Sequence, residues 1–225
     1  MAAAAGRTQA GSASAAASPR GLLVALEGID GSGKSSLAER LVERCEARGL
    51  PAVLTREPTD TWLGEAVRRS IREGGDPFVD AFLFLADHAA HVRQCSAWLA
   101  EGKVVVSDRW GDSCLAYQAA ALEPHLAARG TQALDWLLAA QGPITRRPDV
   151  VLLLDLAPEL ALQRIATRPE LVKFEEREFL AKVRRNYLDL AKRLPGYEVL
   201  DATQGSDALF EQAWRALARR LGEEA

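Results

Sequence analysis

Short apolar runs alternate with amphipathic stretches along the chain from residue 22 onward. Such alternation is typical of a parallel β-sheet whose strands are connected by crossover helices. The apolar runs predict strands at residues 22–27, 52–55, 104–107, 150–155 and 198–201. The amphipathic stretches predict helices at residues 34–48, 77–100, 112–122, 131–140, 158–167, 176–194 and 206–221. The pattern therefore predicts an α/β domain built on a five-stranded parallel sheet.

The longest predicted helix, which Asp76 can cap and Pro77 can open, carries two stripes at helical spacing. The first stripe consists of Phe78, Phe82, Leu85, Ala89 and Val92. It predicts core packing, and its first three members are also candidates for an interface with a second copy. The second stripe consists of Phe84, His88, His91 and Cys95. Phe84 and His88 lie one turn apart and could stack on and hold a planar base, although packing alone would also explain the phenylalanine.

The first twenty residues differ in composition from the rest of the chain. They contain nine alanines and three serines, and no acidic residue precedes Glu27. Such a segment cannot build a core, so we predict a disordered tail at residues 1–20 and a single domain at residues 21–225. A cytoplasmic location is expected, and the alternative is an organellar one, because a transit peptide has a similar composition. The three cysteines form no CxxC pair, which favours a reducing compartment.

Charge and hydropathy narrow the classes of partner. The 225 residues include 28 Lys and Arg against 31 Asp and Glu, a net charge of −3. This balance argues against a nucleic-acid partner, since a domain that binds nucleic acid is usually basic. The apolar runs are also too short to span a membrane. A local anion-binding site stays compatible with the composition, because phosphate capture needs only a few well-placed cations.

The strongest chemical signal follows the first predicted strand. Residues 28–35 read Gly-Ile-Asp-Gly-Ser-Gly-Lys-Ser, which satisfies the pattern G-x-x-x-x-G-K-[ST] between a strand and a helix. In such a P-loop the glycines let successive backbone N–H groups point at a phosphate chain. Lys34 can then reach the β- and γ-phosphates, and the Ser35 hydroxyl is placed for Mg²⁺. The loop predicts binding of ATP or GTP but does not identify the acceptor.

Charged residues follow two other predicted strands. Arg56 and Glu57 follow the second strand, and Asp108 and Arg109 follow the third. Ligands of an open parallel sheet bind beyond the carboxyl ends of its strands. We therefore expect Asp108 to hold Mg²⁺ through water, and Arg56 and Arg109 to converge on an anion beside the P-loop.

Three cations, Arg164, Arg168 and Lys173, lie in and after the helix predicted at residues 158–167. No apolar period runs through residues 168–173. The segment is either a mobile lid that brings positive charge over a transferring phosphoryl group or an exposed loop whose charges are balanced by nearby glutamates.

Taken together, these residues resemble the thymidylate kinases, of the nucleoside monophosphate kinase group of P-loop proteins. The resemblance covers nearly all of residues 22–221. It rests on Glu-Gly-Ile-Asp-Gly-Ser-Gly-Lys-Ser at 27–35, Thr-Arg-Glu-Pro at 55–58, Leu-Gly-Glu at 63–65, Leu-Phe-x-Ala-Asp at 83–87, Asp-Arg-Trp-x-x-Ser-x-x-Ala-Tyr-Gln at 108–118, Pro-Asp at 148–149, Tyr-Leu-x-Leu-Ala at 187–191 and Leu-Asp-Ala at 200–202. It implies a three-layer P-loop kinase fold with helices on both faces and a short mobile lid. It also implies a homodimer, and transfer of the γ-phosphoryl group of ATP, with Mg²⁺, to dTMP.

The resemblance also assigns roles to individual residues. Phe84 would stack on thymine, Arg56 and Arg109 would hold the dTMP phosphate, Tyr117 and Gln118 would contact the nucleoside, and Asp30 would lie near the sugar 3′-OH and the attacking phosphate. The implied substrate-binding residues are Asp30, Arg56, Glu57, Phe84, His88, Arg109, Ser113, Tyr117 and Gln118. The implied ATP-binding residues are Gly28, Ile29, Asp30, Gly31, Ser32, Gly33, Lys34, Ser35, Ser36 and Arg168, and the implied metal ligands are Ser35 and Asp108. The implied catalytic residues are Lys34, Arg109, Asp30, Arg164, Arg168 and Lys173.

The chain departs from the family pattern at a few positions. His88 stands where the family has an arginine that reads the thymine carbonyl edge, and Thr59-Asp60 replaces a glycine pair. The P-loop also lacks an arginine after Asp30, which resembles the subgroup whose catalytic cation comes from the lid. Three other functions stay open: a kinase for another monophosphate such as dUMP, a deoxynucleoside kinase with Glu57 as base, and a non-catalytic nucleotide sensor.

Overall fold

The predicted parallel sheet is present in the computed structural model, which describes residues 21–165 and 177–222. Its strands are β1 (Leu22–Glu27), β2 (Ala52–Arg56), β3 (Val104–Asp108), β4 (Val150–Asp155) and β5 (Tyr197–Asp201). All neighbours pair in parallel, in the order β2-β3-β1-β4-β5. The prediction of a five-stranded parallel sheet is therefore confirmed. The predicted tail at residues 1–20 lies outside the described residues.

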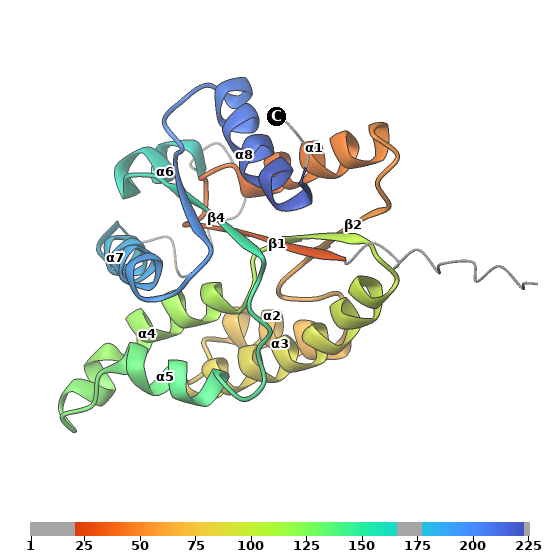
Figure 1. Ribbon diagram of the computed structural model, residues 1–225. Coiled ribbons are helices and arrows are strands. Elements are labelled where there is room, and N and C mark those ends of the chain that lie inside the picture. The colour runs from red at the N-terminus through yellow and green to blue at the C-terminus, as the bar shows by residue number, and fades with distance from the viewer. Residues whose placement is uncertain (1–20, 166–176, 223–225) are drawn as a thin grey trace, which may run out of the picture.

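Helices cover both faces of the sheet, so the domain has three layers (Figure 1). The helices are α1 (Lys34–Ala47), α2 (Trp62–Glu73), α3 (Pro77–Ala100), α4 (Gly111–Ala127), α5 (Ala133–Gln141), α6 (Pro158–Ile165), α7 (Arg177–Arg193) and α8 (Ser206–Leu221). Helices α1 and α8 pack on one face, and α3 and α7 pack on the other with α4 between them. Helices α2 and α5 lie against α3 and α4. None of the described helices is long and apolar enough to cross a membrane.

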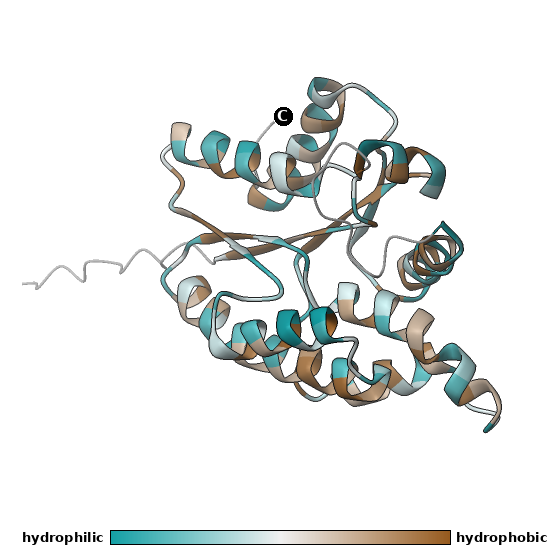
Figure 2. Cartoon of the chain, turned by 180° about the vertical axis from the view of Figure 1, so that it is seen from behind, coloured by the Kyte–Doolittle hydropathy of each residue, from teal (hydrophilic) through white to brown (hydrophobic). Residues whose placement is uncertain are grey.

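The three central strands β1, β3 and β4 are buried along almost their whole length. Strands that are covered on both faces read as continuous apolar runs, which is why their bounds could be predicted to within one residue. Leu23 and Ala25 of β1 face α3, where they meet Cys95 and Leu99. The alternate residue Val24 packs into the larger cluster with Leu41 of α1. Hydrophobic positions accordingly follow the strands, and the outer side of α1 is hydrophilic (Figure 2).

The strand order creates a switch point beside β1. The chain passes from β1 to the edge strand β2, returns to β3, and then crosses to β4 on the other side of β1. Connections therefore leave the carboxyl ends of β1 and β3 in opposite directions, which opens a crevice above these two ends. Glu27 and Asp108 end these strands, so the P-loop and the Asp108-Arg109 segment meet there.

Helix α2 was not predicted by the hydrophobic pattern. Only Gly64 and Val67 are buried among its twelve residues, and Leu63 and Ile71, which share the helical spacing of Val67, are only partly buried. Gly64 allows close backbone contact, because a Cβ there would lie 1.9 Å from the Thr59 carbonyl oxygen. Helix α2 thus packs tightly on the segment that follows β2.

Two other predictions about helices were wrong in part. Helix α4 continues to Ala127 rather than ending at residue 122, because buried Leu122 and Leu126 lie one turn apart and favour helix past Pro124. The first stripe of α3 is not core along its length, since Phe82 is 57% exposed. His88, His91 and Cys95 of the second stripe are buried instead. They are buried because their partners lie on other elements: both histidines contact Glu57, and Cys95 packs against β1. Spacing along one helix does not reveal such partners.

Candidate active site

The P-loop joins β1 to α1 and depends on its glycines. Gly28, Gly31 and Gly33 have φ values of 139°, 82° and 99°, in the region that favours glycine. Space is limited as well, because a Cβ would lie 2.6 Å from the Leu154 carbonyl oxygen at Gly28 and 2.8 Å from that of Ala161 at Gly31. The structure therefore brings residues 28–36 together as a loop followed by the first residues of α1, where backbone N–H groups favour an anion.

Lys34 lies inside this loop. Its Nζ donates to the Ile29 carbonyl oxygen at 2.9 Å and lies 3.4 Å from Ser32 Oγ. Burial of the ammonium group, together with the nearby Arg109, lowers the pKa of Lys34 to about 8. The negative charge of a phosphate chain would favour the charged form of this lysine.

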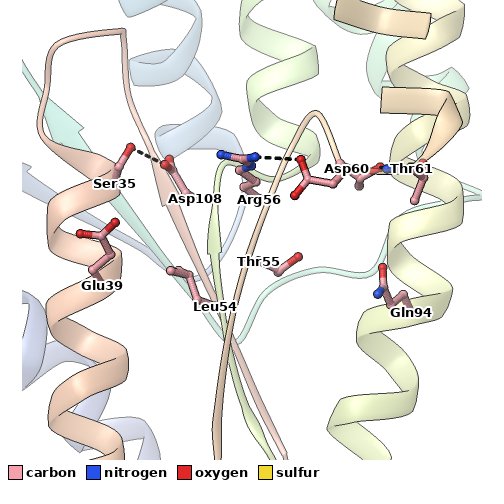
Figure 3. A pocket seen from close by; sticks show the side chains of 10 residues that line it. Ser35, Glu39, Leu54, Thr55, Arg56, Asp60, Thr61, Gln94 and Asp108 are labelled. Carbon is pink, nitrogen blue, oxygen red and sulfur yellow. Dashed lines mark hydrogen bonds and ion pairs between the residues drawn. The ribbon is translucent and has the colours of Figure 1, made fainter. Parts of the chain in front are cut away.

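Ser35 and Asp108 bring two oxygen ligands together beside the loop. Ser35 Oγ donates to Asp108 Oδ2 at 2.6 Å (Figure 3). A hydroxyl and a carboxylate are ligands that Mg²⁺ uses together with phosphate oxygens and water. Within residues 21–165 and 177–222, no group of three His, Cys, Asp or Glu side chains is arranged to hold a metal ion. The donor set therefore fits a metal shared with a nucleotide better than a site made by the protein alone.

Arg109 links the P-loop to α4. It adopts the left-handed backbone conformation, with φ of 73°. Its Nη2 donates to Asp30 Oδ1 at 2.5 Å and its Nη1 to Ser113 Oγ at 3.1 Å. Burial alone would raise the pKa of Asp30, but Arg109 and Lys34 lower it to about 2. Tyr117 also donates to Asp30 Oδ2 at 2.9 Å. Four predicted site residues from two segments are thus brought together.

Glu27 fixes the turn that carries Arg109, and it was absent from the predicted site. Its Oε1 accepts from the backbone N–H groups of Trp110 at 2.9 Å and Ser113 at 3.2 Å. Its Oε2 accepts from Ser113 Oγ at 2.5 Å and Tyr187 Oη at 3.0 Å. Burial and the neighbouring Asp112 raise the pKa of Glu27 to about 8. A charged residue at the end of a buried strand was the available signal for this role.

A cavity of about 190 Å³ opens beside Arg109. Its lining includes the predicted residues Asp30, Phe84, Arg109, Ser113, Tyr117 and Gln118. Arg68 and Ile71 of α2 also line it, and neither was predicted. Gln118 is 0% exposed, and neither polar atom of its side chain has a hydrogen-bond partner among the described residues. Such an amide is available to a ligand that offers a matching donor and acceptor.

His88 and Glu57 do not line this cavity, contrary to the expected substrate contact. His88 is 0% exposed, and its Nδ1 and Nε2 lie 2.8 Å from Glu57 Oε1 and Thr145 Oγ1. His91 Nδ1 lies 2.8 Å from the same Glu57 oxygen. Burial would raise the pKa of Glu57, but the two histidines lower it. The physical reason is that a buried carboxylate needs donors, and α3 supplies two of them.

Arg56 and Arg109 line different cavities. Arg56 is 63% exposed and pairs with Asp60 at 2.7 Å. It lines a second cavity, of about 510 Å³, together with Ser35 and Asp108 (Figure 3). The expected convergence of the two arginines on one anion therefore does not appear in the lining of a shared cavity.

Of the three predicted lid cations, only Arg164 is among the described residues. Its Nη2 donates to the Ala202 carbonyl oxygen at 3.0 Å, and its Nη1 lies 3.4 Å from the Gly31 carbonyl oxygen. Arg164 thus reaches the P-loop from α6. Arg168 and Lys173, and with them the predicted lid, lie outside the described residues.

Known proteins resemble this chain over most of its length. A family model described as thymidylate kinase matches residues 26–213. A probable thymidylate kinase of Methanosarcina mazei is 43% identical over 188 residues, which are 82% of this chain and 89% of that protein. A probable thymidylate kinase of Methanosarcina barkeri is 41% identical over 205 residues, or 90% of this chain and 98% of the relative. One of Thermococcus kodakarensis is 38% identical over 215 residues, or 90% and 100% of the two chains.

Proposed function

The chain belongs to the thymidylate kinase family, and from that premise we propose that it transfers the γ-phosphoryl group of ATP to dTMP, giving dTDP and ADP. The observation that carries this proposal is the placement of the cavity. The cavity that holds Phe84, Tyr117 and Gln118 adjoins Arg109 and Asp30, and Asp30 is itself part of the P-loop. A donor polyphosphate on the loop and an acceptor nucleotide in the cavity would therefore meet at Arg109.

The proposed reaction requires no covalent intermediate with the protein and no general base. The acceptor oxygen of dTMP is already anionic, so no side chain has to remove a proton from it. Lys34 would neutralise charge on the β- and γ-phosphates. Arg109 would use the planar fork of its guanidinium to hold the acceptor phosphate in line with the γ-phosphate. Glu57, the candidate base for a nucleoside 5′-OH, is bound by two histidines and does not line the cavity. The site therefore favours a monophosphate over an uncharged nucleoside.

Mg²⁺ would be held by Ser35 and Asp108, directly or through water, together with phosphate oxygens. When bound, it would neutralise negative charge on the phosphate chain. The protein's own part is to fix these two oxygens at the carboxyl end of β3. Arg164 would add positive charge at the P-loop from α6, with Arg168 and Lys173 as further cations of the proposed lid.

A panel of acceptors tests the proposed function. Purified enzyme is incubated with ATP, Mg²⁺ and one of dTMP, dUMP, dCMP, dGMP or thymidine, and release of ADP is measured. We expect dTMP to have the highest kcat/KM. Turnover of thymidine without turnover of dTMP would instead indicate a deoxynucleoside kinase, and tight ATP binding without turnover of any acceptor would indicate a sensor.

The proton uptake that accompanies ATP binding provides a second test. Because burial lowers the pKa of Lys34 to about 8, roughly half of this lysine is neutral near pH 8. Bound ATP should restore its charge, so binding should take up about half a proton near pH 8 and almost none near pH 6 from this group. Calorimetry in buffers of different ionisation enthalpy measures this uptake. Lys34→Arg, which stays charged, is the control and should lack it; equal uptake by both proteins would contradict the assignment.

We further propose that the chain forms a homodimer through the outer face of α3. Val79 and Phe82 are 51% and 57% exposed there, an apolar surface that a second copy would cover. Phe82→Glu should therefore shift the protein from dimer to monomer in light scattering coupled to size exclusion. Val199→Glu is a matched control, because Val199 is also 51% exposed but lies on the edge strand β5. An unchanged mass for Phe82→Glu, or an equal loss for Val199→Glu, would rule this interface out.

A further inference from the structure

The residue that would read the base by analogy with the family is not available for it. His88 is fully buried, with one ring nitrogen 2.8 Å from Glu57 Oε1 and the other 2.8 Å from Thr145 Oγ1. Turning the ring toward the cavity would remove a donor from a buried carboxylate, which is costly. His88 therefore serves the packing of α3 against the segment after β2, and the cavity needs another donor.

Arg68 is a candidate for this donor, because it lines the cavity. It belongs to α2 and lines the cavity together with Phe84 and Gln118. Its Nη1 donates to the Pro58 carbonyl oxygen at 3.1 Å, which holds the side chain against the loop. Within the described part of the chain, no acidic side chain forms a salt bridge with Arg68. Since a guanidinium has five N–H donors in a fixed plane, the contact with Pro58 leaves others for a ligand.

Gln118 supplies the complementary half of a recognition site. Its side chain is buried, lines the same cavity, and has no partner for either polar atom among the described residues. An amide can pair with one N–H donor and one carbonyl acceptor of a thymine edge. The 4-keto group of thymine is an acceptor, whereas cytosine carries an amino donor at that position. A guanidinium that donates to this position would accept thymine and reject cytosine, because two donors cannot pair.

We propose that Arg68, on α2, reads the 4-keto group of the pyrimidine and thereby takes the role that the family pattern assigns to the position of His88. This inference rests on the proposed function, since it names the specificity determinant of the same acceptor site. Gln118 pairs with the adjacent ring N–H, and Phe84 provides the stacking surface in the same cavity. Base recognition in this chain thus depends on a helix that packs on the phosphate-binding segment.

Two acceptors that differ at the 4-position make the test specific. Wild-type enzyme, Arg68→Met and Arg69→Met are assayed with dTMP and with 5-methyl-dCMP, and kcat and KM are determined separately. Methionine keeps an apolar stem and loses the donors. Arg69 is the matched control, because it lies next to Arg68 on α2, is 71% exposed, and pairs with Glu73 at 2.8 Å.

The expected result is a loss of selectivity. In Arg68→Met, kcat/KM for dTMP should fall roughly tenfold to a hundredfold, mainly through KM, since a site that hydrogen-bonds a substrate discriminates strongly by that bond. Activity toward 5-methyl-dCMP should stay the same or rise, so the ratio between the two acceptors should collapse. Arg69→Met should keep the wild-type ratio, and Arg68→Lys, which retains a charged donor, should keep an intermediate one.

A structural role of Arg68 would give a different outcome. Loss of the contact with Pro58 could loosen the segment after β2, and both acceptors would then suffer equally with an unchanged ratio, which would overturn the proposal. A collapse of the ratio in His88→Asn but not in Arg68→Met would overturn it as well. These outcomes are separate from failure of the proposed function, which would appear as wild-type enzyme without turnover of dTMP.

Discussion

Lys34→Ala is expected to lower kcat by at least about a thousandfold, because removal of one preorganised donor from a developing phosphoryl charge costs on the order of 10²–10³ in rate and Lys34 carries a full charge as well. The side chain is buried inside the P-loop and contacts the Ile29 carbonyl oxygen, so no other described lysine can replace it there. The measurement is steady-state release of ADP with saturating ATP and dTMP.

Lys34→Ala should not unfold the protein. Burial in the P-loop disfavours the charged ammonium group, as its pKa of about 8 indicates. The thermal midpoint should therefore stay equal or rise while activity is lost. Lys103→Ala is the matched control, since Lys103 pairs with Glu101 near the start of β3 and lies away from the loop. Turnover by Lys34→Ala equal to that of the wild type would contradict the mechanism.

The parts of this fold that could be predicted are those in which the local sequence pattern matches the burial that the residues have in the folded structure. Strands β1, β3 and β4 are buried on both faces, and their apolar runs alone locate them. The P-loop could also be predicted, because its glycines are required by the local backbone conformation and the loop joins a strand and a helix that are adjacent in sequence. Helix α2 failed this condition: Val67 is its one buried side chain beyond a glycine, and Leu63 and Ile71 at the same helical spacing are only partly buried.

The residues near the expected base-binding position show why spacing along one helix was insufficient to predict which side chains contact the base. Phe84 and His88 are one turn apart, and that spacing predicted a joint contact with a base. The partner that decides the orientation of His88 is Glu57, which lies 31 residues earlier in the chain and is itself buried. The same limit applies to Arg68 and Glu27, whose contacts with Pro58 and Ser113 span 10 and 86 residues. Such contacts become visible only when the sheet and its loops are assembled.

The acceptor side of the reaction depends on Arg109, and we expect Arg109→Met to lower kcat/KM for dTMP by roughly 10²–10³-fold. Its guanidinium is held by Asp30, by Ser113 and over the Tyr117 ring at 5.0 Å, so it is oriented before any acceptor binds. Glu27 fixes the backbone beneath it through Trp110 and Ser113. Because the Arg109 side chain is already ordered, acceptor binding costs little further conformational entropy at this residue. Its removal should therefore have a large effect on kcat/KM.

Arg109→Lys separates charge from geometry. A lysine keeps the positive charge but cannot bind a phosphate with a planar fork, so it should recover only part of the loss, with kcat/KM still at least about tenfold below wild type. Affinity for ATP in the absence of acceptor should change little in either variant, since the ATP phosphates rest on the P-loop. Arg215→Met, on the exposed side of α8, is the matched control. Full activity in Arg109→Lys would show that charge alone suffices, and an equal loss of ATP affinity would place Arg109 on the donor side instead.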